Sequence, residues 1–320
     1  MKNFFFLLFL LSISFESIAQ WVPQNSGYPN QPFFDCYFLD AQNGWVVGGA
    51  RLKTTDGGET WVDKSPIHPG DWWAFSVFFF NKSIGFLSGN GKIYKTTNGG
   101  NSWYVVHQTL LYGHNIRSFD FIDSLKGWGA GGYGDGNYLA YTSNGGENWT
   151  EISVPTDYLL KSIDFNDSLT GFAVGDNGIV IKTTNGGNTW LQINIGGPYW
   201  WFTKVQFISE STGWILGWVG SESAVFRTTD GGNSWHMHII GNNNAALNTI
   251  FFIDSQQGWA GGGPIFYTSN GGQNWEFVQY TPDIYSMFLV DRFHGWAVGG
   301  NGLIFFSSNG GLPVLSLIHI

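Results

Sequence analysis

The chain has 320 residues and a formal net charge of −9, and only 14 of its residues are lysine or arginine. This balance excludes the basic stripe that nucleic-acid-binding proteins normally present, so we expect no nucleic-acid partner. Aromatic residues make up 18% and charged residues 12% of the chain, which also contains 46 glycines. Such a composition excludes a disordered protein and is typical of many short strands joined by tight turns.

The N-terminus has the pattern of a secretory signal peptide over residues 1–19. Lys2 precedes an apolar run at residues 4–13, and the small residues Ser17 and Ala19 mark a predicted cleavage site after residue 19. The apolar run is too short to span a bilayer. The sequence therefore predicts a protein that does not span the membrane and is exported to the periplasm, the cell surface or the extracellular space.

Residues 20–311 are predicted to form one domain built from a sequence repeat. A Thr-x-Asp/Asn-Gly-Gly-x-x-Trp element occurs six times with its tryptophans 40 to 46 residues apart, and a seventh copy at residues 307–311 lacks the tryptophan. A Gly-Trp or Gly-Phe pair lies upstream of every copy, and its glycines are Gly44, Gly85, Gly127, Gly171, Gly213, Gly258 and Gly295. Two markers that keep one phase seven times predict a radial array of repeats.

The fourth repeat shows the predicted strands most clearly. Segments typical of strands at residues 161–165, 171–175, 179–183 and 190–193 are separated by polar, glycine-containing turns. Four antiparallel strands in one repeat make one blade of a propeller. Seven repeats of this kind predict an all-β protein, a seven-bladed β-propeller with four-stranded antiparallel blades.

The two ends of the repeat region are predicted to meet. Trp21–Asn25 resembles the residues that follow the tryptophan in the other repeats, so we expect it to supply the outer strand of the seventh blade and to close the ring. Residues 312–320 depart from the repeat and are predicted to be an atypical tail, artefactual or truncated. Cys36 is the single cysteine, which excludes an intramolecular disulfide, and it is expected to be a buried thiol.

The polar residue of each Asp/Asn-Gly-Gly element has a mechanical explanation. Its side chain can bond backbone amides nearby, and the glycines adopt backbone angles that a Cβ would forbid. A catalytic site occurs once, whereas this device occurs in every repeat. We therefore interpret the following residues as structural: Asp56, Asn98, Asn144, Asn185, Asp230, Asn270 and Asn309.

The repeat also resembles a known family. The first copy matches the pattern of the Asp-box, or bacterial neuraminidase repeat, through Thr54, Asp56, Gly58, Thr60 and Trp61. Together with the Gly-Trp-x-Val-Gly segments, the pattern over residues 21–311 is similar to that of the photosystem II stability/assembly-factor-like propellers, which include secreted bacterial proteins. The resemblance implies a protein-binding scaffold. Those relatives are thought to use an arginine-rich patch, which the four arginines of this chain cannot reproduce.

Glycoside hydrolases that share the repeat are the alternative. A sialidase needs three arginines around the substrate carboxylate, but Arg51 and Arg227 fall on predicted third strands, Arg292 falls in a turn, and only Arg117 lies near the expected axial opening. A xyloglucanase-type enzyme pairs two propellers, and the sequence predicts one. The histidines are scattered and give no metal-binding spacing. We therefore expect no enzyme, no cofactor and no metal.

A binding site is predicted where the repeats differ from one another. Residues just before the first strand of each blade should rim the central opening, and those selected are Trp72, Trp73, Arg117, Lys161, Trp200, Trp201 and Tyr285. Paired tryptophans offer flat faces to sugars or peptide side chains, but the same rings could instead fill the wide channel as core. We interpret the chain as a monomeric, non-catalytic binding or assembly scaffold whose ligand is a protein or a carbohydrate.

Overall fold

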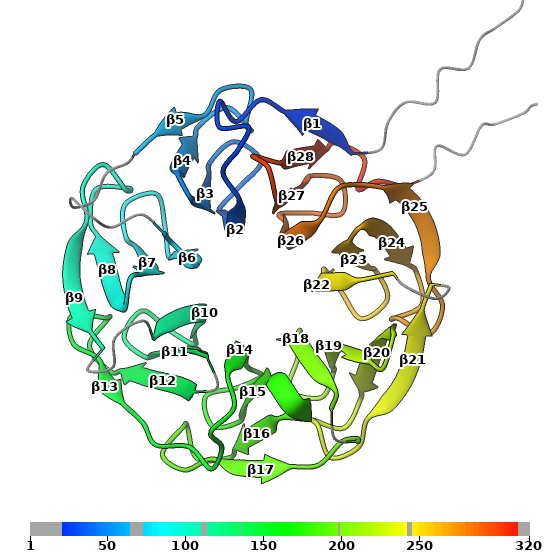
Figure 1. Cartoon of the computed structure of the whole chain (residues 1–320). Coiled ribbons are helices and arrows are strands. Elements are labelled where there is room, and N and C mark those ends of the chain that lie inside the picture. The colour runs from blue at the N-terminus through cyan, green and yellow to red at the C-terminus, as the bar shows by residue number, and fades with distance from the viewer. Residues whose placement is uncertain are drawn as a thin grey trace, which may run out of the picture.

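The computed structural model describes residues 21–64, 73–109, 114–134, 136–197, 199–241 and 245–312. Their strands form seven four-stranded antiparallel sheets that stand as blades around a central axis (Figure 1). The prediction of an all-β, seven-bladed propeller is confirmed. The predicted signal peptide, Trp72 and all but the first residue of the predicted tail lie outside the described residues.

In each blade the first strand lines the axis and the last lies at the outer surface (Figure 1). The first three blades are β2 (Phe33–Phe38), β3 (Gly44–Gly48), β4 (Arg51–Thr54), β5 (Val62–Asp63); β6 (Ser76–Phe79), β7 (Gly85–Gly89), β8 (Lys92–Thr96), β9 (Tyr104–Gln108); and β10 (Asn115–Phe121), β11 (Gly127–Tyr133), β12 (Gly136–Thr142), β13 (Thr150–Glu151). The fourth and fifth are β14 (Leu160–Phe165), β15 (Gly171–Gly175), β16 (Val180–Thr183), β17 (Leu191–Ile193); and β18 (Trp201–Phe207), β19 (Gly213–Val219), β20 (Glu222–Thr228), β21 (His236–Ile240). The last two are β22 (Leu247–Phe252), β23 (Gly258–Gly262), β24 (Pro264–Thr268), β25 (Glu276–Tyr280); and β26 (Ile284–Leu289), β27 (Gly295–Gly299), β28 (Ile304–Ser307), β1 (Val22–Gln24). A short 3-10 turn, η1 (Asp176–Gly178), is the one helical element of the described chain.

The N-terminal strand closes the ring, as predicted. β1 pairs antiparallel with β28, and Val22 lies opposite Phe306 in the register. Trp21 precedes this strand, is 1% exposed and packs into the core between the sixth and seventh blades. It lies against the turn at Gly311, where a Cβ would come within 2.2 Å of the indole nitrogen. Trp21 therefore fills the place that the seventh repeat leaves without a tryptophan.

The Gly-Trp and Gly-Phe markers join neighbouring blades. Trp45 stacks on Phe79 of the next inner strand with a centroid separation of 3.6 Å, and Trp214 stacks on Phe252 at 3.7 Å. The Trp214 indole also donates a hydrogen bond of 2.9 Å to the carbonyl of Gly271 in the next blade. Because each ring buries a large apolar area between two sheets, the marker acts as a repeated blade-to-blade contact.

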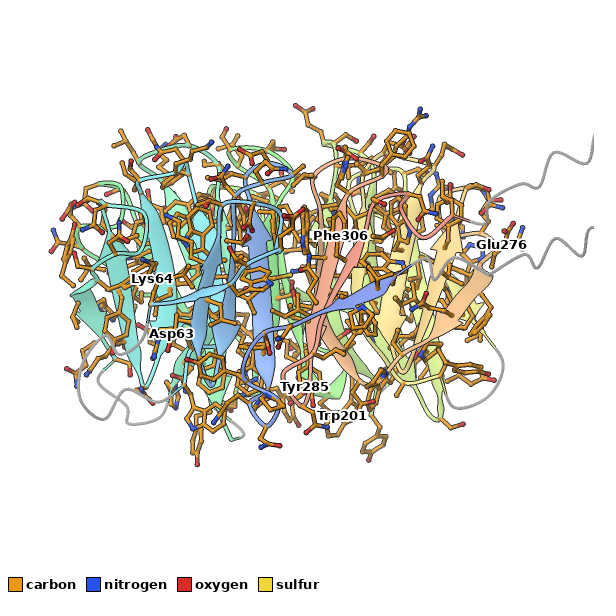
Figure 2. The ribbon with its side chains drawn as sticks, turned by 90° about the horizontal axis from the view of Figure 1, so that it is seen from above. Asp63, Lys64, Trp201, Glu276, Tyr285 and Phe306 are labelled. Atoms are coloured by element: carbon orange, nitrogen blue, oxygen red, sulfur yellow. The ribbon has the colours of Figure 1, made fainter. Side chains whose placement is uncertain are left out.

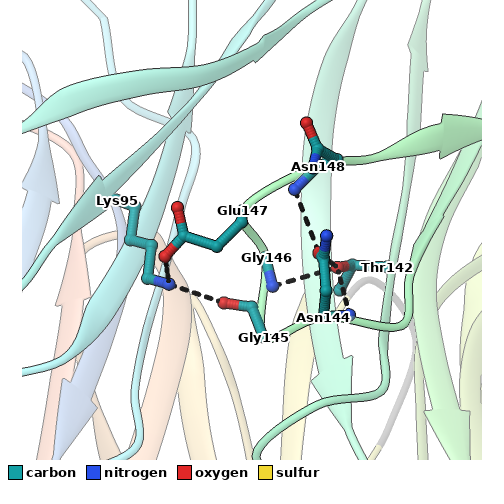
Figure 3. Close-up of polar contacts among 7 residues, drawn as sticks. All are labelled: Lys95, Thr142, Asn144, Gly145, Gly146, Glu147 and Asn148. Carbon is teal, nitrogen blue, oxygen red and sulfur yellow. Dashed lines mark hydrogen bonds and ion pairs between the residues drawn. The ribbon is translucent and has the colours of Figure 1, made fainter.

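The Asp/Asn-Gly-Gly turns hold their own shape, as the third blade shows (Figure 3). The Thr142 hydroxyl donates to Asn144 Oδ1 at 3.0 Å and accepts the Gly146 amide at 2.9 Å. Asn144 Oδ1 also accepts the Asn148 amide at 3.1 Å. Gly145 and Gly146 have φ angles of +69° and +74°, which a side chain would strain. The Thr142 and Asn144 side chains therefore form these hydrogen bonds within the turn itself.

Lysines on the third strands anchor these turns from the preceding blade. The Lys95 side chain is 8% exposed, donates to the Gly145 carbonyl at 2.8 Å and forms an ion pair with Glu147 (Figure 3). The second blade carries Phe86 where five other blades carry a tryptophan, so no indole shares this bond. Lys95→Met should therefore lower the free energy of unfolding by about 1.5–3 kcal/mol, the range for a hydrogen bond to a charged group.

Lys53 offers a matched control for this prediction. Its ammonium donates to the Gly99 carbonyl at 2.9 Å, and the Trp45 indole points to the same oxygen at 3.4 Å. Lys53→Met leaves that second donor in place, so urea denaturation should show a smaller loss than for Lys95→Met. Equal losses in the two variants would show that the carbonyl contact is not what Lys95 contributes.

Candidate functional site

The inner strands carry β-bulges at one end of the central channel. In six blades the register of the inner strand shifts by one residue, and the extra residue faces the axis. Tyr285, one of these residues, lies with Trp201 at the same end of the propeller in side view (Figure 2). The bulge residues, with Phe75 in the equivalent place before β6, form what we call the mouth ring: Phe34, Phe75, Arg117, Lys161, Thr203, Asn248 and Tyr285.

A glycine at the end of the second strand makes room for the bulge. A Cβ at Gly175 would lie 1.9 Å from the carbonyl oxygen of Leu159, and a Cβ at Gly299 would lie 1.9 Å from that of Asp283. Any other residue there would push the start of the inner strand away, because backbone rather than a mobile side chain is in contact. The last glycine of the Gly-Trp-x-Val-Gly pattern therefore shapes the mouth ring.

One half of the mouth is aromatic. Phe34 stacks on Phe75 with centroids 5.3 Å apart and on Tyr285 at 6.1 Å, and Trp73 contacts Phe34 at 5.8 Å. Trp73 is 39% exposed and Tyr285 is 37% exposed. These four residues, called the aromatic arc below, present flat apolar faces from the seventh, first and second blades.

The opposite half of the mouth is cationic. Arg117 and Lys161 line a cavity of about 310 Å³ together with Lys204, one residue beyond the ring on β18, and these three form the cationic arc. Lys161 makes an ion pair of 2.5 Å with Asp176 and lies 5.3 Å from the centroid of the Trp201 ring. Burial lowers the pKa of Arg117 and Asp176 opposes this change, but a guanidinium stays charged at neutral pH.

Three carboxylates lie deeper in the channel. Asp35, Asp120 and Asp164 line a second cavity of about 210 Å³, which Lys204 also contacts. Each carboxylate accepts a backbone amide of the next blade, and the bond from Phe165 to Asp120 is 2.7 Å long. The carboxylates therefore serve as blade-to-blade contacts.

Burial raises the pKa of all three carboxyl groups. Burial raises the pKa of Asp120 to about 6 against the opposing effect of its backbone hydrogen bonds and Lys204. The pKa of Asp164 lies well above its usual value because of burial and the neighbouring charge of Asp120. The pKa of Asp35 is also raised by burial, although Lys204 opposes the rise. Part of this cluster is thus protonated in weakly acidic solution.

Aromatic side chains share the deeper level of the channel with Asp120 and Asp164. Tyr37 packs against Phe288 at 4.8 Å and Phe78 at 5.2 Å, Phe78 stacks on Phe121 at 4.8 Å, and Phe251 contacts Phe288 at 5.2 Å. The deeper level of the channel therefore combines aromatic rings from the first, second, sixth and seventh blades with carboxylates from the third and fourth.

The structure brings five of the seven predicted site residues to the mouth: Trp73, Arg117, Lys161, Trp201 and Tyr285. Trp200 differs from the expectation. It is half-buried and packs against Phe226 at 5.2 Å in the core around the fifth blade, and it lines neither cavity. Trp200 precedes β18 and packs inward, whereas Trp201 is the first residue of β18 and is exposed.

Several site residues were not among those selected from the sequence: Phe34, Phe75, Lys204, Asp35, Asp120 and Asp164. A signal for three of them is present in the repeat. Asp120 and Asp164 occupy the position before the last residue of the inner strand, where Tyr37, Phe78 and Phe288 stand in other blades. A carboxylate at a position that is aromatic elsewhere indicates a polar channel. Lys204 departs from the repeat in the same way, because serines stand at its position in the second, third and fourth blades.

Three further observations concern the described part of the chain. Among the described residues, no three histidine, cysteine, aspartate or glutamate side chains converge so that they could hold a metal ion. No helix in the described part of the chain has the length and apolar character needed to cross a membrane. Cys36 is a buried free thiol.

These features define a seven-bladed β-propeller built on Thr-x-Asp/Asn-Gly-Gly turns, with a polar cavity at one end of its axis. The family model described as photosynthesis system II assembly factor YCF48 matches residues 14–114, 107–199 and 200–285. The chain therefore belongs to this family.

Known proteins similar to this chain agree with that assignment. The photosystem II assembly lipoprotein Ycf48 of Synechococcus sp. (strain CC9902) is 32% identical over 95 residues, and the match spans 27% of each protein. A structure described as YCF48 bound to D1 peptide has a TM-score of 0.72 at 19% identity and covers 91% of this chain and 97% of that chain. YCF48 from Cyanidioschyzon merolae has a TM-score of 0.70 at 16% identity, with 90% and 98% covered. The two structures support the fold.

Proposed function

We propose that this chain is an exported, monomeric, non-catalytic scaffold that binds a segment of a partner protein at the mouth ring. Membership of a family of assembly factors supports the scaffold role. The observation that carries the proposal is the cavity of about 310 Å³ between the aromatic arc and the cationic arc. A cavity of this size suits a few side chains of an extended peptide, and its mixture of rings and a few polar groups is typical of ligand sites.

A peptide ligand has a precedent in the fold. One similar structure is described as YCF48 bound to D1 peptide. For this chain we propose a peptide ligand but not that partner, because its four arginines form no patch and Arg117 alone lies at the mouth.

The contacts of the channel carboxylates support binding without catalysis. An ancestral GH74 enzyme shares the fold with a TM-score of 0.71 at 18% identity, and this chain covers 46% of it. Glycoside hydrolysis requires two carboxyl groups that flank an accessible bond. Asp35, which lines the mouth cavity, accepts hydrogen bonds from Ser76 and Ser286 at 3.0 and 2.8 Å. Asp120 and Asp164 line only the deeper cavity.

The proposal is tested by exposing the protein to a peptide array and a glycan array side by side. Trp73→Ala/Trp201→Ala removes two rings that are 39% and 49% exposed, so the variant should fold. We expect peptides to bind the unmodified protein, and the double variant to bind them at least about tenfold more weakly, since aromatic side chains dominate interface energetics.

Trp200→Ala is the control, because Trp200 packs in the core. This variant should melt at a lower temperature and keep its peptide binding below that temperature. Binding to glycans alone would replace the protein ligand by a carbohydrate. Peptide binding that survives in Trp73→Ala/Trp201→Ala would place the binding site away from the mouth.

A further inference from the structure

The free hydrogen-bonding groups of the mouth cavity are mostly donors. Among the described residues, the Arg117 guanidinium, the Lys204 ammonium and the Tyr285 hydroxyl line the cavity without a hydrogen-bond or ion-pair partner. The carboxylate of the cavity is already engaged, because Asp35 accepts two serine hydroxyls and the Val77 amide. A ligand group that supplies hydrogen-bond acceptors would therefore pair with these unpaired donors of the cavity.

The other polar groups of the mouth ring are already bonded within the protein. Lys161 is paired with Asp176 at 2.5 Å. Asn248 donates its amide to the Ile284 carbonyl at 2.8 Å, which leaves its own carbonyl as a free acceptor, and the Thr203 hydroxyl donates to the backbone at 3.4 Å. Arg117 and Lys204 form no direct ion pair, although Asp176 acts on Arg117 and the channel carboxylates act on Lys204 from a longer distance. A ligand carboxylate placed between the two cations would gain a direct ion pair with each of them.

The position of Arg117 joins the two halves of the mouth. Its guanidinium lies 5.7 Å from the centroid of the Phe75 ring, and Phe75 stacks on Phe34. A planar guanidinium binds a carboxylate through two parallel hydrogen bonds. A carboxylate held in this way would bring the adjacent part of the same ligand onto the aromatic arc.

We infer that the mouth cavity binds a peptide carboxylate that lies next to an aromatic side chain, with the carboxylate on Arg117 and Lys204 and the ring on the aromatic arc. This inference rests on the proposed function and names the chemistry of its ligand. The carboxylate comes from an acidic side chain or from the C-terminus of the peptide, and both sources present the same group. A dianion fits less well, because the Asp35 carboxylate lines the same cavity and repels the second charge.

The test uses capped hexapeptides of one background, Gly-Ser-Glu-Phe-Ser-Gly, with Gln in place of Glu or Ala in place of Phe. A fourth peptide, Gly-Ser-Gln-Phe, is left with a free C-terminal carboxylate. Surface plasmon resonance on the immobilised full chain measures each Kd at about 0.15 M salt, where exposed charges are largely screened and contacts in the cavity remain. We expect the two carboxylate peptides that carry Phe to bind at least about tenfold more tightly than the Gln or Ala peptides.

A double-mutant cycle assigns the carboxylate to its partner. Arg117→Gln should weaken binding of the Glu peptide about tenfold and leave the Gln peptide unchanged, because only the first carries the interacting charge. Arg292→Gln removes the same charge from an exposed turn at the opposite end of the seventh blade and should change neither affinity. Unchanged melting temperatures in both variants show that the fold is intact.

The possible outcomes separate this inference from the proposed function. Equal affinities for the Glu and Gln peptides, with no effect of Arg117→Gln, would overturn the carboxylate inference while peptide binding at the mouth stands. No peptide binding, with binding of an oligosaccharide of glucuronic acid that Arg117→Gln abolishes, would overturn the peptide ligand in both proposals. Binding of the C-terminal carboxylate peptide alone supports the inference and identifies the source of the carboxylate.

Discussion

Replacing Trp21 by alanine should lower the free energy of unfolding by about 3–5 kcal/mol, the range for truncating a buried tryptophan. Trp21 is 1% exposed, and its backbone exchanges two hydrogen bonds with the Gln279 side chain of the sixth blade. The three residues of β1 pair with β28 without a covalent connection between the two strands. Loss of the indole therefore removes packing and also weakens the closure of the ring.

Urea denaturation measures the loss of stability, and hydrogen exchange of the β1 and β28 amides reports whether the closure opens locally. Trp61→Ala is the matched control, since Trp61 follows the turn of the first blade in the same way. Trp61 is only half-buried and its strand continues the chain, so both effects should be smaller. A Trp21→Ala variant with unchanged amide exchange in β1 would show that other contacts hold the ring closed.

Replacing Asp120 by asparagine should make the protein more stable above pH 7. Burial raises the pKa of Asp120 from 3.8 to about 6. A carboxyl group with a raised pKa in the folded state binds its proton more tightly there, so its contribution to stability is full below about pH 4 and is lost as the pH rises through 6. Removing the ionisable group should raise the free energy of unfolding at pH 8 by about 2–3 kcal/mol, on the basis of 1.36 kcal/mol per pKa unit.

The surroundings of Asp120 favour this substitution. The other titratable groups that line the same cavity are Asp35, Asp164, Lys204, Arg117, the Cys36 thiol and the Tyr37 phenol. A neutral asparagine removes a charge that raises the pKa of Asp164. Gln206, at the equivalent position in the fifth blade, shows that an amide side chain can make this contact. It accepts a hydrogen bond of 2.8 Å from the backbone amide of Phe252 in the next blade and donates one of 2.9 Å to the Phe252 carbonyl. Asparagine should therefore keep the blade-to-blade bond.

The measurement is a series of urea denaturation curves between pH 4 and pH 8. As the pH rises, ionisation of Asp120 should lower the free energy of unfolding of the unmodified protein. The Asp120→Asn variant should show a flatter dependence of this free energy on pH. Asp123→Asn is the control, because backbone amides of Leu125 and Lys126 lower the pKa of this exposed turn carboxyl and keep it ionised throughout the range. Its profile should keep the slope of the unmodified protein. A slope that is the same in Asp120→Asn would contradict the assignment.

The repeat determines the fold because its signals are local. The Asp/Asn-Gly-Gly turns and the Gly-Trp markers act over a few residues, so their spacing in the sequence predicts four strands per blade and seven blades. The closure by Trp21 could also be predicted, since the seventh repeat lacks the tryptophan that the N-terminus provides. Each of these features depends on the identity of residues that are close together in the chain or equivalent in the repeat.

The candidate binding site was predictable only in part, because its residues come from different blades. The sequence indicated that the region before each inner strand faces the opening, and this holds for Arg117, Lys161 and Tyr285. It did not indicate which of two neighbouring tryptophans faces the opening. Only the tertiary packing of Trp200 against Phe202 and Phe226 of the fifth blade decides that it enters the core.

The sequence by itself determined the propeller, the number of its blades and the strand that closes it. The tertiary structure decided that Asp35, Asp120 and Asp164 share a channel with Lys204, and that unpaired donors face an aromatic arc across one mouth. The physical reason is that charge, burial and hydrogen-bond satisfaction in the channel depend on seven strands from distant repeats. Their side chains meet only when the ring is closed.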